Sequence, residues 1–130
     1  MKAFISIKYH PDNRSRDTIE HIASALEDNG YQTVCVVRDV EQWGHIRLSP
    51  QELMARTFEE IDSSDVVVID LSEKGVGLGI EAGYAHARGV PVVAIARKGS
   101  DISATLRGIS RQVFWYAGWD ALRPVVRQIS

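Results

Sequence analysis

A run of β-branched residues, a loop with three glycines and a glutamate follow one another near the middle of the chain. Residues 66–69 predict a buried strand, Gly75, Gly77 and Gly79 lie in the loop, and Glu81 is expected in the first turn of a helix. Glycines let a backbone approach a ligand closely, and a helix N-terminus offers free N–H groups to an anion. The positive end of the helix dipole favours an ionised Glu81, which beside a phosphate or sugar site would be a nucleophile. The same spacing also fits an ordinary strand-to-helix crossover with an N-terminal glutamate.

Three other positions beside predicted strands have side chains suited to binding. Lys8 follows the first strand and would pair with an anion, and Tyr9 next to it would contact a base or sugar. Asp70 ends the third strand, where ligand contacts concentrate. Exposed surface positions are the alternative for Lys8 and Tyr9.

The segment 38–45 is rich in recognition chemistry. Trp43 offers an aromatic face, while Asp39 and Glu41 would accept hydrogen bonds from a base or sugar. The alternative is an interface loop in which Trp43 is buried against a partner subunit.

Strand and helix patterns alternate along the chain and must position these side chains. Strands are predicted over 3–7, 33–37, 66–69, 91–96 and 113–116, and helices over 19–26, 49–63, 80–88, 102–109 and 119–129. Ser49-Pro50-Gln51-Glu52 is a strong helix start, with a serine cap, proline in the first turn and glutamate three residues past the cap.

Five such βα units predict an α/β fold, a Rossmann-like, doubly wound, five-stranded parallel sheet with helices on both faces. Ligands bind beyond the carboxyl ends of the strands in such sheets. The segments 6–10, 38–45, 70–81 and 97–103 are therefore expected around one crevice.

The bulk composition is that of one globular domain over residues 1–130. Hydrophobic residues make up 45% and charged residues 25%, and the net charge of −2 argues against binding to a nucleic-acid polymer. No run is apolar enough for a membrane span, and Cys35 as the single cysteine favours the cytoplasm. No metal-site spacing is present, and neither a metal nor a cofactor is expected.

Three motifs resemble the nucleoside 2-deoxyribosyltransferase superfamily, most closely its deoxynucleoside 5'-monophosphate N-glycosidases. The first is the strand from Asp65 followed by GLGIEAGYA at 77–85; the others are SIK at 6–8 and SATLRG at 103–108. The likeness covers most of the chain. It implies a flavodoxin-like fold, a homodimer or larger homo-oligomer, and a nucleoside or nucleotide substrate.

The resemblance also implies roles for individual residues. Glu81 matches the glutamate that attacks the anomeric carbon of the sugar, where a carboxylate stabilises an oxocarbenium-like transition state. Ser6 and Lys8 match the phosphate-contacting turn, and Ser103 matches a serine that reaches the phosphate in the neighbouring subunit. We therefore expect hydrolysis or deoxyribosyl transfer at an N-glycosidic bond.

The chain departs from the family pattern at the acid that would protonate the leaving base. Thr57 and Gly75 occupy the two places where relatives carry an aspartate, and Glu60 or Asp39 is the nearest substitute. Two alternatives follow: a nucleotide-binding module without catalysis, and a TIR-like domain that cleaves NAD.

Overall fold

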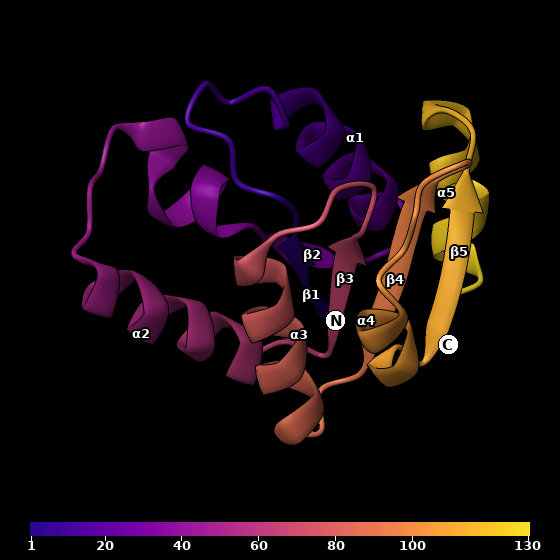
Figure 1. Ribbon diagram of the computed structural model, residues 1–130. Helices are drawn as coiled ribbons and strands as arrows, with labels where there is room; N and C mark the ends of the chain where they lie inside the picture. Colours follow the sequence, from indigo (N-terminus) through magenta and orange to yellow (C-terminus); the bar gives the residue numbers. More distant parts are fainter.

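Five parallel strands form one sheet in the order β2-β1-β3-β4-β5 in the computed structural model, which describes residues 1–130 (Figure 1). The strands are β1 Lys2–Ser6, β2 Gln32–Val34, β3 Val66–Asp70, β4 Val92–Arg97 and β5 Gln112–Tyr116. The chain runs from β1 outward to β2, then crosses back to β3. This order is flavodoxin-like and has its topological switch point between β1 and β3. The predicted fold class is confirmed.

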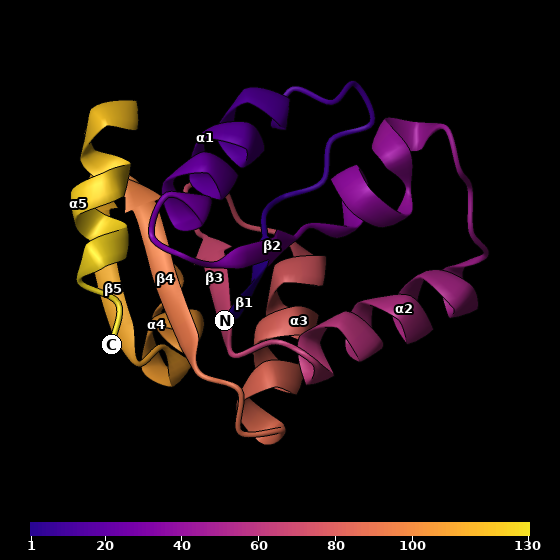
Figure 2. The same ribbon diagram turned by 180° about the vertical axis from the view of Figure 1, so that it is seen from behind.

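Helices cover both faces of the sheet. The α-helices are α1 Arg16–Glu27, α2 Pro50–Asp62, α3 Val76–Ala87, α4 Ala104–Ile109 and α5 Leu122–Arg127. Helices α1 and α5 pack together behind the sheet, whereas α3 and α4 lie in front of it and α2 packs against α3 (Figures 1 and 2). None of these helices has the length and apolar character needed to cross a membrane.

The central strands are buried on both faces, and successive side chains enter different cores. On β3, Val66 and Val68 pack into the core under α1 and α5, while Val67 and Ile69 pack into the core under α3. This alternation follows from the period-two geometry of a strand, and it explains the uninterrupted apolar run in the sequence.

The start of α2 forms as the capping pattern predicts. The Ser49 hydroxyl accepts a hydrogen bond from the Glu52 backbone N–H, and the Glu52 carboxylate accepts one from the Ser49 N–H. Pro50 occupies the first helical position. This cap fixes where α2 begins, and side chains of α2 line the cavity described below.

The second strand is shorter than predicted. It ends at Val34, and the chain then winds into a π-helix, η1 Val36–Val40, followed by the 3₁₀ turn η2 Gln42–Gly44. Because β2 is an edge strand, no further strand holds residues 36 and 37 extended. The Asp39 carboxylate accepts a hydrogen bond from the Cys35 N–H, which stabilises the turn at its start.

The predicted closing helix over 119–129 is divided in two. A 3₁₀ turn, η3 Trp119–Ala121, precedes α5, and the Trp119 ring stacks on His21 of α1 with centroids 4.3 Å apart. This contact joins the last helical segment to the first helix.

Candidate active site

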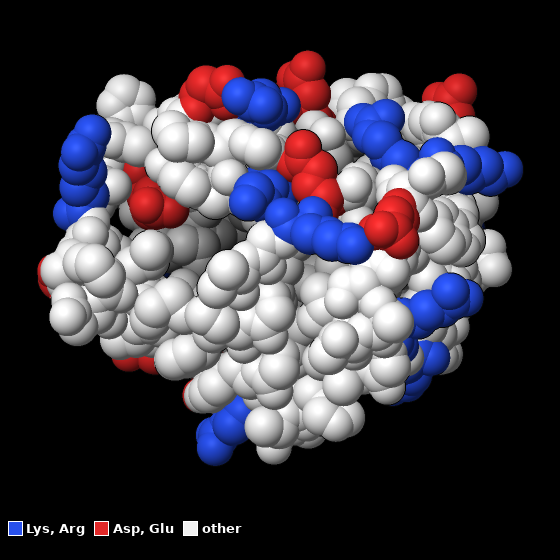
Figure 3. Space-filling model, viewed as in Figure 1, with Lys and Arg blue, Asp and Glu red and all other residues white.

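A cavity of about 320 Å³ opens at the carboxyl ends of β1 and β2. Its walls come from β1 and the segment after it, the start of α1, the segment after β2, one side of α2 and the first two turns of α3. Figure 3 shows the hollow on the face viewed in Figure 1. The size suits a small organic ligand. The charged or hydrogen-bonding side chains of the lining are Lys8, Tyr9, His10, Asn13, Ser15, Arg16, Glu41, Trp43, Thr57 and Glu81.

Glu81 lies inside this cavity and is held by one hydrogen bond. The hydroxyl of Ser6, the last residue of β1 and 1% exposed, donates to Glu81 Oε1 at 2.9 Å. Gly77 lies one turn earlier on α3, where a Cβ atom would come within 3.6 Å of Glu81 Oε2. That distance is an ordinary van der Waals contact, so the second carboxylate oxygen lies directly beside Gly77.

The position and protonation of Glu81 differ from the expectation. Helix α3 begins at Val76, four residues before the predicted start, so Glu81 is its sixth residue and lies in the second turn. The helix dipole acts mainly within the first turn. Burial raises the pKa of the Glu81 carboxyl from 4.5 to about 7, and the Ser6 hydrogen bond only partly opposes this rise. The predicted preference for the ionised form was therefore wrong, because desolvation outweighs the dipole.

Replacing Ser6 by alanine is expected to raise the pKa of Glu81 further. The hydroxyl stabilises the ionised carboxylate, and its loss leaves burial unopposed. NMR titration of the Glu81 side-chain carboxyl would measure the shift. Ser64→Ala, which removes a serine hydroxyl bonded to the Glu60 carbonyl near the amino end of β3, is the control. An unchanged or lowered Glu81 midpoint in the Ser6 variant would contradict this account.

A second, polar pocket of about 240 Å³ adjoins the cavity and shares Ile7, Lys8, His10 and Ser15 with it. Lys8, Arg14 and Arg97 contribute positive charge, and Asp70 and Glu73 contribute negative charge. The Arg97 guanidinium makes a cation–π contact with the Trp119 ring, whose centre lies 4.6 Å away. Arg14 is paired with Asp12 at 3.0 Å, whereas Lys8 and Arg97 form no ion pair. Because these cations outnumber the two carboxylates, this second pocket is called the basic pocket below.

Asp70 forms the buried floor of this second pocket. It is 3% exposed and accepts hydrogen bonds from the Tyr116 hydroxyl at 2.6 Å and the Ser72 N–H at 2.8 Å. Burial and the neighbouring Asp70 carboxylate raise the pKa of Tyr116, so the phenol remains a hydrogen-bond donor. Asp70 thus contributes to the shape of the pocket. Its two carboxylate oxygens accept hydrogen bonds from Tyr116 and Ser72.

The loop glycines have different surroundings. A Cβ atom at Gly75 would lie 2.9 Å from Lys8 Cδ, so the absence of a side chain lets the Lys8 stem lie against the loop. Gly77 lines the cavity, whereas Gly79 is exposed on α3, where a Cβ atom would meet nothing within 4 Å. Of the three, Gly75 and Gly77 therefore border the candidate site residues Lys8 and Glu81.

Several predicted site residues meet in the cavity and others lie outside it. Lys8, Tyr9 and Trp43 line it together with Glu81, and the Arg16 guanidinium lies 4.6 Å from the centre of the Trp43 ring. Ser103 instead caps α4, where its hydroxyl accepts a hydrogen bond from the Leu106 N–H. Ser103 borders neither pocket within this subunit.

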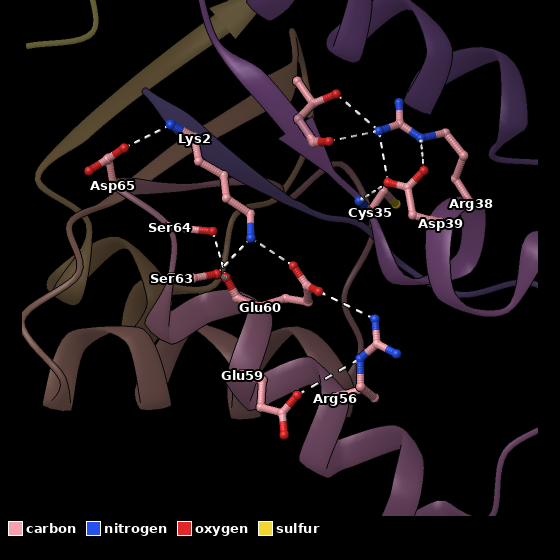
Figure 4. Close-up of polar contacts among 11 residues, drawn as sticks. Lys2, Cys35, Arg38, Asp39, Arg56, Glu59, Glu60, Ser63, Ser64 and Asp65 are labelled. Atoms are coloured by element: carbon pink, nitrogen blue, oxygen red, sulfur yellow. Dashed lines mark hydrogen bonds and ion pairs between the residues drawn. The ribbon is translucent and has the colours of Figure 1, made fainter.

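The two carboxylates expected to substitute for the missing acid are engaged elsewhere. Glu60 is paired with Lys2 at 2.7 Å and with Arg56 at 3.4 Å, and Asp39 is paired with Arg38 at 2.9 Å. Figure 4 shows these pairs. Neither lines the cavity. Thr57 does line it, and its hydroxyl donates to the Leu53 carbonyl.

Sequence reasoning missed several residues of the lining. Asn13 comes from the loop after β1, Leu53 and Met54 come from α2, and Arg14 lines the second pocket. The rule that ligands bind at the carboxyl ends of parallel strands predicts the segments after β1 and β2 as parts of the site. No local sequence pattern indicates that α2 lies against the same cavity.

Comparison with known proteins finds similarity in sequence and in structure. A Thermofilum pendens protein named as a 2'-deoxynucleoside 5'-phosphate N-hydrolase is 29% identical over 121 residues, which span 88% of this chain and 82% of the relative. No protein-family model matches the chain.

Two solved structures show the same fold at low sequence identity. The CMP N-glycosidase BcmB of Clostridium botulinum superposes with a TM-score of 0.73 and 16% identity, over 99% of this chain and 100% of that one. A 2-deoxyribosyltransferase from Bacillus psychrosaccharolyticus superposes with a TM-score of 0.74 and 12% identity, over 95% of this chain and 90% of that one.

Proposed function

We propose that this chain is a member of the nucleoside 2-deoxyribosyltransferase superfamily and forms one catalytic domain that breaks the N-glycosidic bond of a nucleoside or nucleoside 5'-monophosphate. The reaction is hydrolysis or deoxyribosyl transfer, with Glu81 as nucleophile. The N-hydrolase, N-glycosidase and deoxyribosyltransferase named above are enzymes that act on nucleosides or nucleotides, which supports this class of reaction.

The observation that carries the proposal is the placement of Glu81. Its carboxyl group lies in a cavity of suitable size, with Oε1 held by Ser6 and Oε2 beside Gly77. Breaking an N-glycosidic bond builds positive charge at the anomeric carbon, which an adjacent carboxylate stabilises or traps covalently. Burial strengthens this attraction because little water screens it.

The adjoining basic pocket favours a 5'-monophosphate over a free nucleoside. Lys8 belongs to both pockets, and its ammonium group makes no ion pair within the chain. A sugar at Glu81 would direct its 5' substituent toward Lys8, Arg14 and Arg97. Charge-assisted hydrogen bonds from these groups would hold a phosphate.

We further propose a homodimer or larger homo-oligomer in the cytoplasm. Val76 and Ile80 on the outer side of α3 are 83% and 46% exposed, and few charged side chains lie over α3 and α4 in Figure 3. An exposed apolar face of this kind suits contact with a second copy. Ser103 begins α4 beside this face, consistent with a role across the subunit boundary. The unpaired, buried Cys35 suits a reducing compartment.

A chromatographic screen for free base tests the reaction. Ribo- and deoxyribonucleoside 5'-monophosphates, the matching nucleosides and NAD are incubated with the protein, with and without a second free base. We expect base release from at least one monophosphate, with sugar phosphate as the second product of hydrolysis or a new nucleotide as the product of transfer. Saturable nucleotide binding without release would favour the non-catalytic module, and consumption of NAD alone would favour the TIR-like alternative.

Replacing Lys8 by methionine is expected to reduce kcat/KM for a 5'-monophosphate about 10- to 100-fold, the value of one charge-assisted hydrogen bond. Methionine keeps much of the stem that packs on Gly75 while removing the charge. The same substitution should leave kcat/KM for the matching nucleoside nearly unchanged. Lys98→Met, at an exposed lysine outside both pockets, is the control. Equal losses on nucleotide and nucleoside would exclude a phosphate contact by Lys8.

A further inference from the structure

We propose that Glu41 is the proton donor to the leaving base. The inference rests on the proposed function and assigns a second catalytic residue to the same cavity. Glu41 and Glu81 are the two carboxyl side chains among the 20 lining residues. Cleavage of an N-glycosidic bond requires a proton for the departing nitrogen base as well as a nucleophile.

The turn after β2 brings Glu41 to the cavity. The Glu41 backbone N–H donates to the Val36 carbonyl at 2.9 Å, which closes the last turn of η1, and the N–H groups of Gly44 and Ile46 donate to the Glu41 carbonyl. Gln42 and Trp43 follow with positive φ angles of 48° and 58°. Two consecutive non-glycine residues in this region are unfavourable. Strained backbone and π-helical turns of this kind are common at functional sites.

The Glu41 carboxyl group is free of the interactions that engage its neighbours. Asp39 is paired with Arg38 and Glu60 with Lys2, whereas Glu41 has no side-chain hydrogen bond and no ion pair. Burial raises its pKa above the ordinary value for glutamate. Burial raises the pKa of Glu81 as well, so the two roles are assigned by position, and the unpaired Glu41 carboxyl is the one free to contact a ligand.

The positions of the two carboxyls assign their roles. Lys8 joins the cavity to the basic pocket, which defines the phosphate end of a bound nucleotide, and Glu81 with Ser6 lies at the sugar. Glu41 lines the cavity and not the basic pocket. The base, on the opposite side of the sugar from the phosphate, would then occupy the part of the cavity away from the basic pocket, where Glu41 is the carboxyl available besides Glu81.

The proposed step conserves atoms, protons and electrons. The C1'–N bond breaks and its electron pair goes to the base nitrogen, which takes the proton from the Glu41 carboxyl, while the Glu81 carboxylate bonds to C1'. Water then attacks C1' and passes one proton to the Glu41 carboxylate as the bond to Glu81 breaks. The products are free base and sugar 5-phosphate, and both glutamates return to their starting protonation states.

The variant Glu41→Gln tests this assignment with two kinds of leaving group. On an ordinary nucleoside 5'-monophosphate, kcat is expected to fall about 10²- to 10⁴-fold, because glutamine cannot supply a proton. On 7-methylguanosine 5'-monophosphate, whose cationic base departs without protonation, the variant should retain most of the wild-type rate. Glu59→Gln, at an exposed position on α2, is the matched control and should behave as wild type on both substrates.

The pH profile gives a second readout on any nucleotide that the wild type cleaves. Deprotonation of the acid makes kcat/KM fall at high pH in the wild type, and this fall should be absent from Glu41→Gln. Full activity of the variant on ordinary nucleotides, equal losses on both leaving groups, or an unchanged alkaline fall would overturn the role of Glu41. If Glu81→Gln is the variant spared on the methylated substrate, the two roles are reversed. A wild type that releases no base from any nucleotide overturns the proposed function itself.

Discussion

Replacing Glu81 by glutamine is expected to lower the rate of base release at least about 10⁴-fold, as loss of a nucleophile commonly does. Glutamine has nearly the same shape and still accepts the Ser6 hydrogen bond to its side-chain oxygen. It cannot carry the negative charge that stabilises the sugar cation. The loss should fall mainly on kcat and apply to ordinary and methylated nucleotides alike. Chromatographic assay of free base under saturating substrate measures it.

The same variant should be more stable than the wild type above pH 7. The folded state holds the Glu81 proton up to about pH 7, whereas an unfolded glutamate releases it near 4.5. The folded state therefore loses stability as pH rises between these values, because a buried charge must form. Glutamine removes that loss, so denaturation curves at pH 5 and pH 8 should differ less in the variant. Substantial base release by a folded Glu81→Gln protein would refute the nucleophile.

Replacing Ile69 by alanine is expected to lower the free energy of unfolding by about 3 to 4 kcal/mol, within the range for large-to-small substitutions in a core. Ile69 is fully buried on β3 and pairs with Ser6 on β1 and Ala94 on β4. Its side chain packs into the core under α3, beside Leu78. The substitution leaves a cavity that these regular strands cannot readily close. Urea denaturation followed by circular dichroism measures the change.

Two further substitutions test whether the loss of stability comes from burial of Ile69 in the core. Ile69→Val should cost about 1 kcal/mol, since it removes one methyl group. Ile46→Ala, at a side chain 40% exposed in the segment between η2 and α2, should cost less than about 1 kcal/mol. Similar losses for Ile46→Ala and Ile69→Ala would contradict the placement of Ile69 in the core.

Local sequence patterns predicted the architecture well because a strand or a helix start can be recognised from a few neighbouring residues. The apolar run at 66–69 and the Ser49 cap both mark elements that form as expected. The predicted element boundaries were wrong where contacts between distant segments determine where a strand or helix ends. Val36 and Val37 have strand propensity but lie beyond the end of an edge strand, where the chain turns instead. At α3, the helix extends back through Gly77 and Gly79, two residues that disfavour helix in isolation.

Site residues could be predicted from the sequence only where they directly follow the carboxyl end of a strand. Lys8 and Trp43 follow strands and meet Glu81 as the topology requires. The partner of Ser6, the pairing of Asp39 with Arg38 and the raised pKa of Glu81 depend on contacts between segments far apart in sequence. No spacing rule carries that information.

The short edge strand leaves much of the cavity wall to segments outside the sheet. The apolar side of this wall includes Val36, Val37, Leu53 and Met54. Ser6 ends β1 inside the sheet, and its hydroxyl holds Glu81 of α3. Substitutions in the outer wall should therefore change the shape of the space open to a ligand while the Ser6–Glu81 pair stays in place.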